Sequence, residues 1–244
     1  MTADLATASA TPLRAILLDK DGTFVDFHQT WGPAAFRVMT RMAGGDRGRV
    51  GRLMAVSHYD EASLSFRPTS PLVAGSSADY GPLWADAIGV PFSAAVTDEM
   101  DRLFVAEGLA GLVAIGDPNA VMIDLKRRGL ILGVVTNDSE NGARSQTAKL
   151  GIDHHFDFIV GWDSGHGRKP EAGQIHAFLD SHGMAPHEVA MVGDSLHDMH
   201  AARKAGVIAV GVTSGPMVPD EFESHADVVL GSIMELGDWL DRRG

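Results

Sequence analysis

Residues 15–23 read AILLDKDGT, so two aspartates one residue apart directly follow a short apolar run. A short run that is apolar at every position predicts a strand buried on both faces of a parallel sheet. Ligands of open parallel sheets bind beyond the carboxyl ends of the strands. We therefore expect Asp19 and Asp21 to lie at the edge of a sheet where a ligand binds.

Two later apolar runs, residues 130–135 and 189–192, also end in polar residues. The polar residues that follow them are Thr136, Asn137, Asp194 and Asp198. Between the two runs, Lys169 ends a polar loop and precedes a proline. Because the strand ends meet at one edge of the sheet, we expect carboxylates, a hydroxyl and a cation to gather there. Such a group is typical of phosphoryl chemistry.

From residue 130 onward, strand-like runs alternate with helix-like stretches. The expected strands are Leu130–Val135, Phe156–Val160, Val189–Val192, Val207–Val212 and Asp227–Leu230, and the expected helices are Ser139–Leu150, Glu171–His182, His197–Ala205 and Ile233–Arg243. This alternation predicts an α/β fold, with a parallel sheet covered by helices on both faces.

Residues 27–113 interrupt the alternation. Helical patterns occur at Ala34–Met42 and Asp98–Leu109, but the segment has no convincing buried strand, and its middle is rich in Pro, Ser and Gly. We predict a separate, mostly helical module here, inserted after the first strand. Residues 13–26 and 114–244 would then form the core, and residues 1–12 a flexible tail.

The composition excludes several classes of function. The chain has 244 residues, a formal net charge of −12 and no cysteine. An acidic protein is a poor partner for nucleic acid or an anionic membrane, and disulfides and thiolate sites are excluded. We expect the opening residues to form neither a signal peptide nor a membrane span. We expect a cytoplasmic enzyme acting on a small molecule; the oligomeric state does not follow from the sequence.

The two aspartates after the first strand suit covalent phosphoryl transfer. Asp19 can attack phosphorus as a nucleophile, and Asp21 can protonate the leaving oxygen and then activate water. Gly22 lets the backbone turn sharply, and the amides at Gly22 and Thr23 can face phosphate oxygens. An ordinary acidic turn would contain the same residues, because Asp-Gly is a common turn pair.

The other polar residues have similar double interpretations. Asp194 and Asp198 suit Mg²⁺, or they could cap and solvate a helix. Lys169 could bind the phosphate or be a surface lysine, and Thr136 and Asn137 could donate hydrogen bonds to phosphoryl oxygens or form a turn. Because all of these residues occur together at or near the ends of predicted strands, a phosphoryl-transfer site is favoured over ordinary turns and surface residues.

Together these motifs resemble the haloacid dehalogenase superfamily of phosphohydrolases. The resemblance covers about two-thirds of the chain and implies a Rossmann-like core with a helical cap at residues 27–113. It assigns Asp19 as nucleophile, Asp21 as acid/base, Thr136 as the hydroxyl residue and Lys169 as the lysine. It also implies Mg²⁺ held by Asp19, the Asp21 carbonyl and Asp194, with Asp198 in support.

Within that superfamily, the resemblance implies an Mg²⁺-dependent phosphatase that hydrolyses a small phosphorylated metabolite through an aspartyl-phosphate, with phosphoglycolate as the leading substrate. Asp21 argues against dehalogenation, and the absence of lysine from residues 27–113 argues against phosphonate cleavage. A phosphosugar mutase and, less favoured, a non-catalytic binding protein remain alternatives.

Some residues carry weaker expectations. Arg67, with the loop 68–77, is the best cap candidate for substrate binding, although it could equally pair with a nearby acid. We expect His28 to be a linker residue, and the histidines to form no zinc site. Trp31, Tyr59 and Trp84 are expected in the cap core. Lys20 is expected to point away from the site, with no role.

Overall fold

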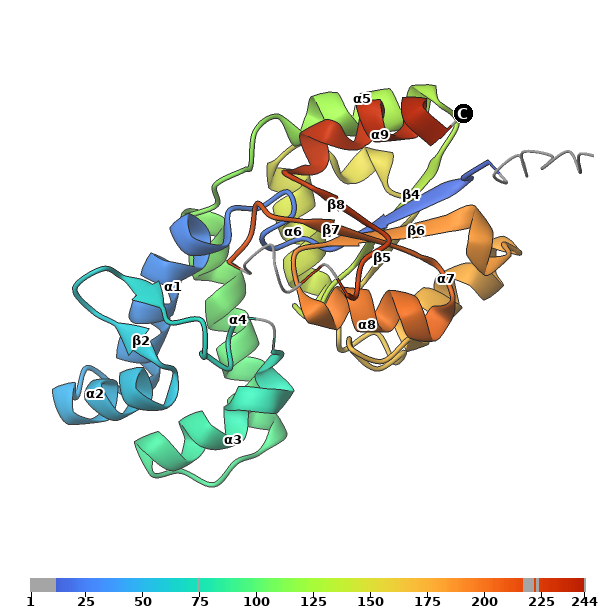
Figure 1. The fold of residues 1–244 in the computed structure, drawn as a ribbon. Coiled ribbons are helices and arrows are strands. Elements are labelled where there is room, and N and C mark those ends of the chain that lie inside the picture. The colour runs from blue at the N-terminus through green and yellow to red at the C-terminus, as the bar shows by residue number, and fades with distance from the viewer. Residues whose placement is uncertain (1–11, 74, 217–221, 223, 244) are drawn as a thin grey trace, which may run out of the picture.

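A computed structural model describes residues 12–73, 75–216, 222 and 224–243 of the chain. The flexible tail expected at residues 1–12 therefore lies outside the described residues, apart from residue 12. Figure 1 shows an α/β body beside a smaller helical body.

A six-stranded parallel sheet forms the centre of the larger body, in the order β5-β4-β1-β6-β7-β8. The strands are β1 (Ala15–Leu18), β4 (Ile131–Val135), β5 (Phe158–Val160), β6 (Val189–Gly193), β7 (Ile208–Val212) and β8 (Val228–Leu230). The α/β fold class expected from the sequence is confirmed.

Helices cover both faces of this sheet (Figure 1). One face packs against α5 (Pro118–Arg127), α6 (Glu140–Lys149) and α9 (Leu236–Arg243), and the other against α7 (Gly173–His182) and α8 (Leu196–Ala205). Short 3-10 helices lie at Asp153–His155, Pro186–Glu188 and Ile233–Glu235. Successive strand residues point to opposite faces, so Ile16 and Leu18 enter one apolar core while Ala15 and Leu17 enter the other.

The register of the central strands places the site. Leu18 of β1 pairs with Val134 of β4 and with Val192 of β6, so these strands end at nearly the same level. The residues that follow them are therefore brought to one edge of the sheet.

The inserted segment forms its own layer of helices. It contains α1 (Phe27–Met42), α2 (Arg47–Val56), α3 (Ser77–Ile88), α4 (Ala94–Ala110) and a two-stranded ribbon of β2 (Tyr59–Asp60) and β3 (Ser65–Phe66). These elements share a hydrophobic core separate from the two cores of the sheet. Its entry and exit lie side by side, because Val25 pairs with Ala114.

Several local expectations differ from the structure. Helix α1 begins seven residues before the expected start at Ala34 and includes Pro33. The ribbon was not expected, because β2 and β3 are too short for a periodic pattern. Helices α2 and α3 are further helices of the expected helical module. The expected helices at 139–150 and 171–182 begin one and two residues later, at Glu140 and Gly173.

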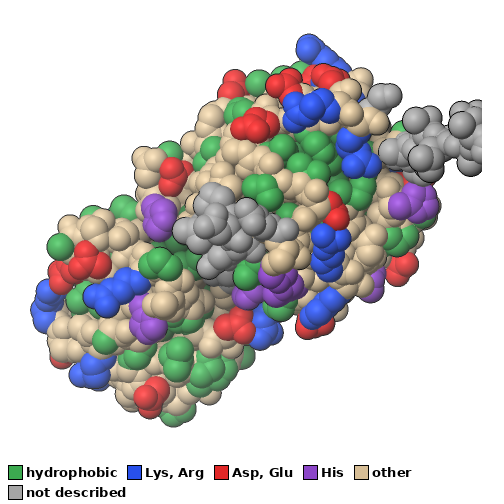
Figure 2. All heavy atoms as spheres, in the orientation of Figure 1, with side chains coloured by type: hydrophobic (Ala, Val, Ile, Leu, Met, Phe, Trp, Pro, Cys, Tyr) green, Lys and Arg blue, Asp and Glu red, His purple; other side chains and the backbone are tan. Residues whose placement is uncertain are grey.

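The face seen in Figure 2 carries Lys and Arg side chains dispersed among Asp and Glu rather than gathered in one patch. Among the residues that the structure describes, no helix combines the length and apolar character that crossing a membrane requires.

Candidate active site

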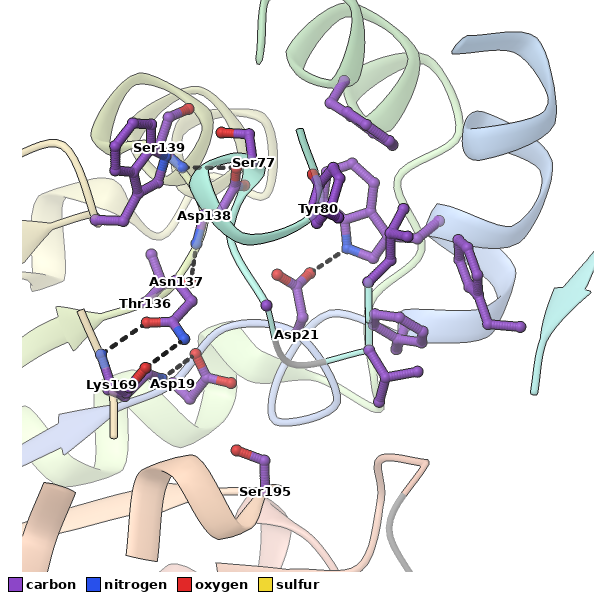
Figure 3. A pocket seen from close by; sticks show the side chains of 18 of the residues that line it. Asp19, Asp21, Ser77, Tyr80, Thr136, Asn137, Asp138, Ser139, Lys169 and Ser195 are labelled. Atoms are coloured by element: carbon purple, nitrogen blue, oxygen red, sulfur yellow. Dashed lines mark hydrogen bonds and ion pairs between the residues drawn. The ribbon is translucent and has the colours of Figure 1, made fainter. Parts of the chain in front are cut away.

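A cavity that is open to solvent lies between the carboxyl edge of the sheet and the helices of the inserted segment. Asp19, Thr136 and Asp194 follow β1, β4 and β6 and line its floor. Asp21, Asn137 and Lys169 also line it (Figure 3). Residues that are far apart in the sequence therefore meet at this edge, as the strand pattern predicted.

Lys169 connects the carboxylates of the floor. Its buried ammonium lies 2.7 Å from Asp19 Oδ1, 2.5 Å from Asp198 Oδ1 and 2.8 Å from the carbonyl oxygen of Val135. Burial lowers the pKa of this ammonium, but the two carboxylates outweigh burial and raise the pKa above its ordinary value. Lys169 is therefore a fixed positive charge beside Asp19.

Asn137 holds the backbone of Lys169 in place. Its side-chain amide donates to the carbonyl of Lys169 and accepts from the amide of Lys169, both at 2.9 Å (Figure 3). The neighbouring Thr136 hydroxyl accepts from the amide of Asp138 at 3.1 Å, and its proton can still be donated. Asn137 thus positions the lysine, and Thr136 presents a donor to the cavity.

Three buried carboxylates offer oxygen atoms to a cation. One oxygen each of Asp19, Asp194 and Asp198 lie within 4.8 Å of one another. Burial raises the pKa of Asp19 to about 7, and burial together with the other carboxylates raises the pKa of Asp194 well above its ordinary value. This excess of buried negative charge over Lys169 fits a divalent cation with oxygen ligands.

Two glycines make room for Asp194. A Cβ atom added at Gly22 would lie 2.1 Å from Asp194 Oδ2, and one added at Gly215 would lie 1.8 Å from it. Asp198 is fixed differently, because its Oδ2 accepts from the amide and hydroxyl of Ser195 at 3.0 and 2.6 Å, at the start of α8. Asp194 thus occupies space that a larger residue at either glycine would fill, and Asp198 is held by Ser195.

Asp21 points away from Asp19, toward the inserted segment (Figure 3). The indole nitrogen of Trp31, on α1, donates to Asp21 Oδ1 at 2.5 Å. The ring of Trp31 in turn packs over Gly108 of α4, where a Cβ would lie 2.6 Å from it. Trp31 therefore packs in the core of the inserted segment, as expected, and also lines the site, which was not expected.

Lys20 also differs from its expected place. It is fully buried, and its ammonium donates to Asp21 Oδ2 and to Gln146 Oε1, both at 2.7 Å, and lies 3.1 Å from Asp138 Oδ2. The side chain does not line the cavity, but it binds the second aspartate of the site, which differs from the expectation that it has no role. The position of Lys20 between two aspartates was the sequence feature that could have indicated an ion pair. The sequence does not show which of the two carboxylates the ammonium contacts.

Of the remaining candidates, the loop 68–77 lines the cavity through Leu72, Val73 and Ser77. Arg67 and His28 are exposed and do not line the cavity. The amide of Gly22 donates to the carbonyl of Val25 and the amide of Thr23 to the carbonyl of Lys20, so both amides are used within the turn. Tyr59 and Trp84 pack in the core of the inserted segment, as expected.

Comparison with known proteins agrees with this geometry. Residues 109–212 match the family model described as haloacid dehalogenase-like hydrolase. A phosphoglycolate phosphatase from Rhodospirillum rubrum is 30% identical over 229 residues, which cover 93% of this chain and 90% of that protein. The chain belongs to the haloacid dehalogenase-like hydrolase family. It is a phosphoric monoester hydrolase of that family.

Solved structures share the fold of this hydrolase. The crystal structure of a predicted phosphoglycolate phosphatase from Haemophilus somnus is similar with a TM-score of 0.71 at 20% identity, covering 93% of this chain and 97% of that chain. The putative β-phosphoglucomutase from Thermotoga maritima gives 0.65 at 18% identity, covering 94% and 99%. At these identities the likeness concerns the fold alone.

Proposed function

We propose that this hydrolase is an Mg²⁺-dependent phosphatase that hydrolyses a small phosphorylated metabolite through a phosphoaspartate at Asp19. The observation that carries the proposal is the contact of Lys169 with Asp19 at 2.7 Å beside a cluster of buried acids. A lysine fixed there neutralises charge on the nucleophile and on the transferred phosphoryl group.

Each residue of the site has a separate role in the proposed reaction. Asp19 attacks phosphorus, and Asp21 donates a proton to the leaving oxygen. Asp21 then accepts a proton from the water that hydrolyses the phosphoaspartate. Lys169 and the Thr136 hydroxyl stabilise the phosphoryl oxygens, and Asn137 keeps Lys169 in place through its two 2.9 Å hydrogen bonds.

The carboxylates of Asp19 and Asp194, with the main-chain carbonyl of Asp21, would hold Mg²⁺, and Asp198 would fix Lys169. The bound ion supplies positive charge that stabilises the phosphoryl oxygens. The buried, mutually repelling acids support this assignment because oxygen ligands with excess negative charge suit a hard cation.

We take residues 27–113 as a cap that excludes bulk water from the reaction. Two observations support this role. Trp31 of the inserted segment binds Asp21, and Asp79 of α3 pairs with Arg168, next to Lys169. Both contacts join the inserted segment to the catalytic edge, so closure and positioning of Asp21 would occur together.

The test is turnover of p-nitrophenyl phosphate with Mg²⁺, with EDTA, and in Asp19→Asn. We expect metal-dependent turnover that Asp19→Asn abolishes. In Asp21→Asn, acid-quenched protein should carry one phosphoryl group on Asp19, because the nitrophenolate leaves without a proton but water is no longer activated. Phosphoglycolate is the reference metabolite, since relatives are named for it.

A phosphosugar mutase is the second candidate, and the fold of the putative β-phosphoglucomutase favours it. Assay of glucose 1-phosphate with a bisphosphate activator separates the two. Isomerisation that exceeds phosphate release would support the mutase, and phosphate release without an activator supports the phosphatase. Metal-independent turnover, or a fully active Asp19→Asn protein, would contradict both the phosphatase and the mutase.

The expected compartment for this enzyme is the cytoplasm.

A further inference from the structure

The wall of the cavity formed by the inserted segment is mostly aromatic. Trp31 and Phe104 lie with their ring centroids 5.9 Å apart, and Tyr80 and Phe104 lie 6.2 Å apart. Phe27 and Phe66 extend the same wall. Aromatic faces attract cations through their electron-rich centres and accommodate apolar groups.

The charged groups of this cavity are almost all negative. Among the described residues that line it, the one basic side chain is Lys169, which already contacts Asp19 and Asp198. Asp101 lies three residues before Phe104 on α4, lines the cavity, and forms no ion pair within the described part of the chain. A carboxylate on the substrate would meet like charge at this wall, where the described lining offers no arginine or lysine other than Lys169 to receive it.

One buried polar atom of the same cavity also lacks a partner. The indole nitrogen of Trp162 has no hydrogen-bond partner among the described residues. The hydroxyl of Ser77, a residue only 2% exposed at the start of α3, lies within hydrogen-bonding reach of Asp101. Buried polar groups are normally hydrogen-bonded, so an unpaired donor that lines a cavity indicates a polar ligand in it.

We propose that the alcohol portion of the substrate carries an organic ammonium group, held between Asp101 and the aromatic side chains of Trp31, Tyr80 and Phe104. This inference rests on the proposed phosphatase function and names its substrate class. The phosphate lies on the floor beside Asp19 and Lys169, and the ammonium lies against the wall of the inserted segment. A short amino-alcohol phosphate, with a positive charge a few bonds from the ester, would place its phosphate on the floor and its ammonium at the wall.

The experiment compares esters that differ in charge but not in shape. Phosphocholine is paired with 3,3-dimethylbutyl phosphate, its neutral carbon isostere, and both are compared with phosphoglycolate and p-nitrophenyl phosphate. The variants are Asp101→Asn and, as a matched control, Asp98→Asn, an exposed acid on the same helix. A second measurement is competition by choline against p-nitrophenyl phosphate, which reports binding of the ammonium without the phosphate.

We expect kcat/KM for phosphocholine to exceed that for its neutral isostere roughly 10-fold or more, the range of a desolvated cation on an aromatic and acidic wall. In Asp101→Asn this ratio should fall toward one, whereas Asp98→Asn should keep it. Competition by choline should weaken in parallel in Asp101→Asn. If phosphocholine and its isostere react equally, or phosphoglycolate reacts faster than both, the ammonium proposal is overturned while the phosphatase stands. If no ester is hydrolysed, p-nitrophenyl phosphate included, the phosphatase itself is contradicted.

Discussion

The ammonium nitrogen of Lys20 lies 2.7 Å from Oδ2 of Asp21, the next residue along the chain. The indole of Trp31 binds the other oxygen of the same carboxylate at 2.5 Å. Lys20 comes from the catalytic core and Trp31 from the inserted segment. The proposed acid/base is therefore held from both sides, and its position depends on how the inserted segment sits on the core.

Replacing Lys20 with methionine should impair proton donation more than phosphoryl binding. General-acid catalysis contributes most for poor leaving groups, so kcat/KM for an alkyl phosphate should fall about 100-fold, and for p-nitrophenyl phosphate much less. The comparison of the two esters is the measurement. Lys126→Met, at an exposed ion pair with Asp157, is the control. Equal losses for both esters would contradict positioning of Asp21 by Lys20.

The same substitution should also destabilise the protein. Lys20 is fully buried, and its removal leaves Asp21 and Asp138 without their cation. Removing one partner of a buried ion pair costs about 3–5 kcal/mol, because the remaining charge stays desolvated. Urea unfolding measures this loss, and it also defines conditions under which Lys20→Met is folded for the kinetics. An unchanged midpoint would mean that the two carboxylates find another partner.

Gly22 should tolerate alanine far less well than a glycine of the same backbone conformation. Gly22 and Gly151 have φ of 74° and 70°, but an added Cβ meets Asp194 at the first and nothing within 4 Å at the second. Both alanine variants should lose about 1–2 kcal/mol of stability from the left-handed backbone. Only Gly22→Ala should also lose activity, by about 100-fold or more, because it displaces Asp194. Comparable activity in both variants would contradict this role for the glycine.

Mg²⁺ should stabilise the protein in the absence of substrate. The ion relieves the repulsion among the buried acids, so a concentration 100 times the Kd should add about 2.7 kcal/mol to the free energy of unfolding. Thermal unfolding with Mg²⁺ and with EDTA at equal ionic strength measures the difference. Asp194→Asn should abolish the stabilisation, whereas Asp180→Asn, at an exposed surface acid, should keep it. The same gain in both variants would place the ion elsewhere.

Asp101 should make the ligand-free protein less stable as the pH rises. Burial, assisted by Asp138, Asp163 and Asp98, raises the pKa of Asp101 from 3.8 to about 6. The folded state binds this proton more tightly, so stability falls between pH 4 and 6. Asp101→Asn should therefore match the parent at pH 4 and exceed it at pH 7.5 by about 1–2 kcal/mol, after allowance for screening of the exposed part. Urea unfolding at the two pH values measures this, and equal differences at both would exclude the effect.

The sequence predicted the catalytic floor because its signals are local. Each key residue directly follows a short apolar run, as Asp19 follows β1 and Asp194 follows β6. Parallel strands end at a common edge, so position along the chain was sufficient to predict convergence. Lys169, in a loop, required the resemblance to a known family, and the structure places its ammonium against Asp19.

The cavity wall could not be predicted in this way. Asp101 and Tyr80 lie on helices whose patterns indicate only which residues are buried, and Arg67, the expected substrate residue, is exposed. Which helical residues face the floor depends on how α1, α3 and α4 pack over it, through contacts such as those of Trp31 with Asp21 and Gly108. These contacts join residues that are distant in sequence and leave no periodic signal.

The buried strands along the chain and the carboxylates that follow them were thus determined by the sequence, since short apolar runs and the residues after them specify a parallel sheet and its reactive edge. The partners of Asp21, the space that glycines leave for Asp194, and the acidic, aromatic wall over the site were decided by tertiary packing. The physical reason is that a strand end fixes where a side chain begins, whereas its contacts depend on the elements that fold against it.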